Sequence, residues 1–199
     1  MPPIVDADAL VVLGGSMSCQ DDAEAPWLAP TRQHIPRTVR AGTPFLGICL
    51  GHQLATVALG GQVCTSDHFC LGAAEMHLTP EGKKDPLLSV YDGHRGIHFN
   101  NDVAVVLPED AVLLARDPTG QIEAVRFAER AWGVQFHPEC TPEIFDAWTI
   151  GHGEKEWQQR LPWSEAVTVA ETVRRDIDTV NAEEAFAARF QELIDPEKR

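Results

Sequence analysis

A strand–turn–helix junction constrains the fold of this chain more than any other feature. Residues 44–48 form an apolar run that predicts a buried strand, and residues 52–59 predict a helix that ends at a Gly-Gly pair. Cys49 lies on the turn between them, and Gly47 and Gly51 permit the sharp elbow that exposes a nucleophile. The positive end of the helix dipole would favour the thiolate. We therefore predict that Cys49 is a nucleophile; the alternative is a buried structural cysteine.

A second motif, residues 134–139 (VQFHPE), supplies the partner that a thiolate nucleophile needs. His137 can protonate a leaving group as a general acid. Pro138 favours an extended backbone at His137, so His137 and Glu139 would point to the same side. The carboxylate would then hold the second ring nitrogen of the imidazole. The alternative is a surface histidine beside a strand end, with Glu139 as an ordinary charge at a helix N-terminus.

A third segment could stabilise an oxyanion. Residues 9–13 are continuously apolar, as expected of a strand that is buried on both faces of a parallel sheet. Gly14 and Gly15 follow and allow the backbone to approach a ligand closely. We predict that the N–H groups of Gly15 and Leu50 hold the oxyanion and that Gly14 contacts the substrate. A simple turn after a strand would give the same pattern.

These three motifs, in this order and spacing, resemble the class I glutamine amidotransferase family over about residues 4–150. The resemblance rests on GGSMS at 14–18 with APWL at 25–28, GICLGHQ at 47–53 and QFHPE at 135–139. It is closest to stand-alone domains similar to the glutaminase subunit of GMP synthase. It implies an α/β, three-layer, flavodoxin-like domain with a mostly parallel sheet. It also implies a triad of Cys49, His137 and Glu139, a glutamyl thioester, and Gln53 in the glutamine pocket.

The sequence departs from the family pattern at three places. The usual first strand–helix–strand unit does not precede residues 9–13, which suggests a truncated or misassigned start or a rearranged sheet. Asn100, Asn101 and Asp102 stand where the family often has His-Gly-Asp, in an expected loop on the substrate side. Ser16 replaces the usual proline after the Gly-Gly pair. The second departure suggests an altered acceptor or glutamine specificity.

Composition excludes several other classes of protein. The 199 residues carry a net charge of −14, and no basic cluster offers a surface for nucleic acid. No apolar stretch predicts a membrane span, no signal peptide is recognisable, and five cysteines suit a reducing cytoplasm. Cys64 and Cys70 with His68 could form a metal or redox pair, but no second pair supports it, so we predict no metal and no cofactor.

The rest of the chain is predicted to alternate between helices and strands. We expect helices over residues 31–40 and 141–148, the second with Thr141 as N-cap. We expect short strands around 73–78, short strands and loops over 85–107, and strands at 112–115, 122–127 and 132–136.

Two domains are predicted: residues 1–150 and a helical extension over 151–199. The extension would hold an amphipathic helix from Ser164 to Val180 and a last helix to Ile194, capped by Asn181 with Glu184. It would pack on the domain, on a partner or on a second copy of the chain.

The interpretation that follows is a cytoplasmic enzyme that hydrolyses L-glutamine at Cys49. No P-loop or synthetase domain is present to use the ammonia, so a separate synthetase would accept it. Two alternatives stay open. One is a hydrolase of γ-glutamyl amides or peptides with the same triad, and the other is a truncated, non-catalytic module.

Overall fold

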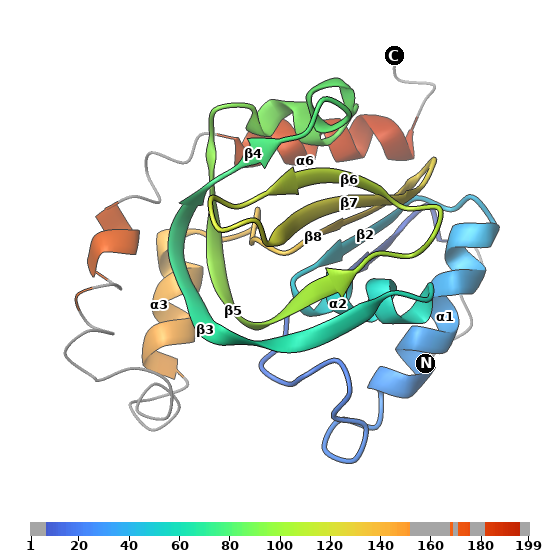
Figure 1. The fold of residues 1–199 in the computed structure, drawn as a ribbon, viewed down its shortest axis with the longest axis horizontal. Helices are drawn as coiled ribbons and strands as arrows, with labels where there is room; N and C mark the ends of the chain where they lie inside the picture. The colour runs from blue at the N-terminus through green and yellow to red at the C-terminus, as the bar shows by residue number, and fades with distance from the viewer. Residues whose placement is uncertain (1–6, 152–167, 169–170, 176–181, 196–199) are drawn as a thin grey trace.

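A computed structural model describes residues 7–151, 168, 171–175 and 182–195 as an α/β fold (Figure 1). Its main sheet has six strands in the order β1-β2-β8-β7-β6-β4. The strands are β1 (Leu10–Val12), β2 (Phe45–Ile48), β4 (His77–Leu78), β6 (Val112–Arg116), β7 (Ile122–Ala128) and β8 (Ala131–Val134).

The sheet is mixed, and its parallel half carries the sequence motifs. Strands β1, β2 and β8 run parallel, with Val12 opposite Gly47 and Ile48 opposite Val134. The pairs β8–β7, β7–β6 and β6–β4 are antiparallel. The carboxyl ends of the three parallel strands therefore meet at one edge, where ligands of open α/β sheets bind.

Alternation along the central strands divides the core into two layers. Phe45 packs with α1 (Leu28–Arg40) and α2 (Leu50–Ala58) on one face. Leu46 packs on the other face, with η2 (Leu88–Tyr91) and α6 (Glu183–Ile194). Helix α6 contacts η2, and Figure 1 shows it on the side of the sheet away from α1 and α2. Helix η1 (Gly82–Lys84) precedes η2 in the chain. Helices on both faces of the sheet confirm the predicted three-layer α/β class.

A second sheet replaces most of the short strands and loops expected around residues 73–78 and over 85–107. Long strands β3 (Gln62–Glu75) and β5 (Arg95–Val106) pair antiparallel, with an irregular register between Thr65 and Cys70. The sequence pattern missed β5 because burial along this strand does not alternate from one residue to the next. Figure 1 shows this pair sweeping past the carboxyl ends of β2 and β8.

Strand β1 differs from its predicted burial on both faces. It is the edge strand of the main sheet, and the side chains of Val11 and Leu13 are 44% and 57% exposed. An apolar run alone cannot distinguish a central strand from an edge strand, because the neighbours decide its burial.

The helices confirm the predicted pattern with shifted ends. Helix α1 begins three residues earlier than predicted and contains Pro36. Helix α3 (Pro142–Gly151) begins as predicted, because the Thr141 hydroxyl accepts a hydrogen bond from the N–H of Ile144. The N-cap of α6 is Ala182, without a side-chain bond, while the predicted cap Asn181 lies outside the described residues. Most of the expected 164–180 helix also lies outside them.

Candidate active site

Cys49 sits at a sharp elbow between β2 and α2. It is the one non-glycine residue among those described with a positive φ (φ 49°, ψ −105°), and its N–H donates to the Val134 carbonyl at 2.8 Å. A Cβ on Gly51 would lie 2.0 Å from the Val12 carbonyl oxygen. Only glycine allows α2 to start so close to β1, and this approach holds Cys49 at the end of its strand.

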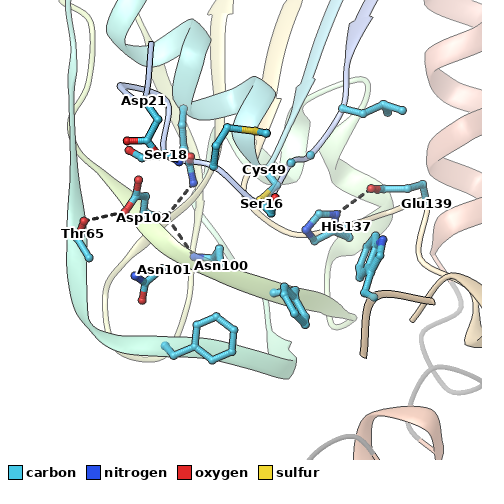
Figure 2. Close-up of a pocket in the computed structure, with 18 of the residues that line it drawn as sticks. Ser16, Ser18, Asp21, Cys49, Thr65, Asn100, Asn101, Asp102, His137 and Glu139 are labelled. Atoms are coloured by element: carbon cyan, nitrogen blue, oxygen red, sulfur yellow. Dashed lines mark hydrogen bonds and ion pairs between the residues drawn. The ribbon is translucent and has the colours of Figure 1, made fainter. Parts of the chain in front are cut away.

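His137 is brought to Cys49 by the parallel pairing of β2 with β8. Its N–H donates to the Ile97 carbonyl of β5 at 2.8 Å, and its Nδ1 lies 2.8 Å from Oε1 of Glu139. Figure 2 shows the Cys49 sulfur on one side of the imidazole of His137 and the Glu139 carboxylate on the other. The geometry agrees with the same-side placement predicted from the His-Pro-Glu spacing.

The charges at this junction favour an imidazolium. Burial alone would lower the pKa of His137, but the adjacent Cys49 and the Glu139 carboxylate raise it to about 10. Nε2 of His137 is buried, and a side-chain hydrogen bond with Cys49 is among the interactions that raise the pKa of the ring. A protonated imidazole beside the sulfur is the arrangement that activates cysteine nucleophiles.

The Gly14-Gly15 segment lies against both other motifs. A Cβ on Gly14 would be 2.8 Å from Cε1 of His137 and 3.6 Å from Cβ of Cys49. A Cβ on Gly15 would be 2.7 Å from Cδ2 of Leu50. The backbone at residues 14–15 therefore lies against Cys49, His137 and Leu50. The first N–H groups of α2 have no partner within their own helix. The oxyanion role of Gly15 and Leu50 stays a prediction.

These residues open into one cavity of about 740 Å³. It is bordered by Cys49, His137 and Glu139 together with polar and aromatic side chains from β3, β5, α3 and the loop after β1. The polar members are Ser16, Ser18, Asp21, Gln53, Thr65, Asn100, Asn101 and Asp102.

Gln53 lines the cavity, and its side-chain amide is hydrogen-bonded to other residues of the cavity wall and the core. Its Nε2 donates to the Asp102 carbonyl at 2.8 Å and to Oε1 of Gln135 at 3.3 Å. Residues 100–102, expected in a loop, belong to β5, because the long strand β3 pairs with them. They do face the substrate side, as expected: Asn100, Asn101 and Asp102 all line the cavity.

Other lining residues had no signal in the sequence. Asp21, Thr65 and Trp148 each come from a different segment, and none belongs to a motif. The ring of Trp148 lies 4.5 Å from that of His137, centroid to centroid. A single acidic or aromatic residue in a loop or helix gives no pattern, so three-dimensional packing alone reveals these contributions.

The comparison with known proteins assigns the chain to a family. Residues 3–151 match the sequence profile of the glutamine amidotransferase class-I family. The chain belongs to the class I glutamine amidotransferase family. A putative glutamine amidotransferase-like protein of Salmonella typhimurium is 33% identical to this amidotransferase over 161 residues, which cover 78% of this chain and 66% of that protein.

Two further relatives support the same family and fold. A glutamine-hydrolyzing GMP synthase subunit of Halobacterium salinarum is 31% identical over 140 residues, which cover 69% of this amidotransferase and 69% of the relative. The crystal structure of a glutamine amido transferase from Methylobacillus flagellatus matches with a TM-score of 0.79 at 25% identity, covering 94% of this chain and 77% of that one. The chain spans about two thirds or less of the length of several curated relatives.

The described part of this amidotransferase has no group of three or more His, Cys, Asp or Glu side chains arranged to hold a metal ion. None of its described helices combines the length and apolar character needed to cross a membrane.

Proposed function

We propose that this class I glutamine amidotransferase hydrolyses the side-chain amide of L-glutamine through a thioester on Cys49. The observation that carries the proposal is the strained elbow that holds Cys49 beside His137, whose Nδ1 bonds to Glu139. The match of residues 3–151 to the family supports the same chemistry.

Each group has one role in the proposed reaction. The Cys49 thiolate attacks the amide carbon, and the N–H groups of Gly15 and Leu50 stabilise the oxyanion. His137, oriented by Glu139, gives a proton to the departing ammonia. His137 then removes a proton from the water that hydrolyses the thioester.

The ammonia needs an acceptor enzyme. Glutamine-hydrolyzing GMP synthases are among the relatives, so we propose a separate synthetase as the partner. All five cysteines are free thiols, which is consistent with a reducing compartment, and we place the reaction in the cytoplasm.

The proposal is tested by labelling the protein with an electrophilic glutamine analogue and measuring intact mass, together with ammonia release from glutamine. We expect one adduct that disappears in Cys49→Ala and persists in Cys64→Ala, a control at an exposed thiol. An unlabelled, folded chain would contradict the proposed nucleophile. An adduct without ammonia release would point to another γ-glutamyl substrate or to an absent activating partner.

A further inference from the structure

The cavity at Cys49 is larger than glutamine requires. Its volume of about 740 Å³ lies in the range of sites for drug-sized ligands, roughly 300–1,000 Å³. We propose that its aromatic half is a subsite for an apolar, aromatic substituent on the amide nitrogen, so that the site cleaves γ-glutamyl amides of aromatic amines as well as glutamine. The inference rests on the proposed function and names a wider substrate class for it.

His137 decides which end of the cavity receives the leaving group. A general acid must lie within roughly 2.6–3.2 Å of the atom that it protonates. The amide nitrogen therefore lies next to Nε2 of His137, and a substituent on that nitrogen must continue past the imidazole. The side chain beside this ring is Trp148, at 4.5 Å between ring centroids.

Beyond Trp148 the aromatic wall continues through two more rings. Phe99 lies 5.9 Å from Trp148, and Phe69 lies 5.5 Å from Phe99 in an edge-to-face arrangement. All three rings line the cavity and are half-buried, as is Ile144 of α3. Ammonia is too small and polar to bury these rings. An aromatic amine would cover them and gain binding free energy from the buried apolar surface.

The opposite end of the cavity suits the α-ammonium group of a glutamyl substrate. Asp21 and Asp102 lie there, on the far side of Cys49 from Glu139 (Figure 2), and no Lys or Arg is among the lining residues of the described chain. Oδ1 of Asn100 is buried without a hydrogen-bond partner among the described atoms, and Asn100 is 5% exposed. An unpaired buried acceptor beside carboxylates calls for a cationic donor. This places the glutamyl head at the polar end and the amine at the aromatic end.

The chemistry is that of ordinary amide hydrolysis. The Cys49 sulfur bonds to the γ-carbonyl carbon, the C–N bond breaks, and its electron pair with the His137 proton leaves as the neutral amine. Water then loses a proton to His137 and bonds to the carbon as the C–S bond breaks. The products are glutamate and the free amine, and no oxidant or other co-reactant is needed.

The test compares L-glutamine, γ-L-glutamylmethylamide and γ-L-glutamylbenzylamide as substrates of the full chain. We expect the benzylamide to have a kcat/KM roughly 10-fold or more above that of the methylamide, a typical gain from an apolar pocket. Phe69→Ala, and independently Ile144→Ala from another element, should remove this preference and leave glutamine hydrolysis within about twofold. Val106→Ala is the matched control, since Val106 is exposed and does not line the cavity.

The outcomes separate the subsite from the proposed function. Ammonia release from glutamine without benzylamide cleavage, or an equal effect of Phe69→Ala on all substrates, would overturn the subsite alone. Benzylamide cleavage without ammonia release from glutamine would support the subsite. A chain that hydrolyses none of the three would overturn both proposals.

Discussion

At the scale of single residues, the candidate site contains two residues in energetically unfavourable conformations or environments. Cys49 occupies a backbone conformation that residues other than glycine rarely adopt, at a typical cost of about 1–3 kcal/mol. Three residues later, His52 is completely buried, stacked on Phe127, and neither ring nitrogen has a hydrogen-bond partner among the described atoms. Cys49 and His52 belong to the same motif. Packing elsewhere in the core must therefore offset both the backbone strain at Cys49 and the burial of the unpaired His52 ring.

His52 predicts a loss of stability in acid. Burial lowers the pKa of His52 from 6.5 to about 4. Between these two pH values, the imidazole is protonated in the unfolded chain and neutral in the folded chain. The stabilising contribution of the neutral ring is present above pH 6.5 and is lost as the pH falls through about 4. At pH 5 the loss should be about 2 kcal/mol of unfolding free energy.

Urea unfolding at pH 7.5 and pH 5 measures this effect. Between pH 7.5 and pH 5, the unfolding free energy of His52→Leu should fall by about 2 kcal/mol less than that of the wild type. The control His77→Gln, at an exposed position, should behave as the wild type. Equal pH dependence of His52→Leu and wild type would contradict the assignment.

At the scale of elements, a buried ion pair ties β5 to β7 beside the active site. Nε2 of His98 lies 2.6 Å from Oε2 of Glu123, and Nδ1 of His98 bonds to the Gly96 carbonyl at 3.0 Å. Burial opposes the charge on His98, but Glu123 and these hydrogen bonds raise its pKa above 6.5. The pair therefore contributes stability below pH 6.5, which is lost as the pH rises through the raised pKa.

We expect Glu123→Gln to destabilise the fold by about 1–3 kcal/mol near pH 6, because the buried His98 loses its charged hydrogen-bond partner. The double variant His98→Leu with Glu123→Leu should lose much less, since no buried charge remains. A double-mutant cycle from urea unfolding, completed by the single variants His98→Leu and Glu123→Leu, measures the coupling. Additive losses in the cycle would show that the pair is not coupled.

At the scale of the whole molecule, the last helix completes the core. Phe186 of α6 is 2% exposed and packs on Tyr91 and Phe136, with ring centroids 5.7 and 6.4 Å apart. Phe136 directly precedes His137. Helix α6 thus covers the face of the sheet next to the segment that holds His137.

Phe186→Ala should therefore lower the unfolding free energy by about 3–5 kcal/mol, as for other large-to-small changes in a core. Chemical denaturation measures it, with Val105→Ala as an exposed control that should change stability by less than about 0.5 kcal/mol. A loss below about 1 kcal/mol would mean that α6 is not part of the folding core.

The sequence by itself determined the elbow at Cys49, the pairing of His137 with Glu139 and the family. These depend on local rules: glycine at a tight turn, alternation in an extended segment and motif order. Only the tertiary structure decided that β1 is an edge strand, that residues 100–102 lie in a strand, and that Asp102 and Trp148 meet at one cavity. Those features depend on the curvature of β3 and β5 and on the packing of α3, which join residues far apart in the chain.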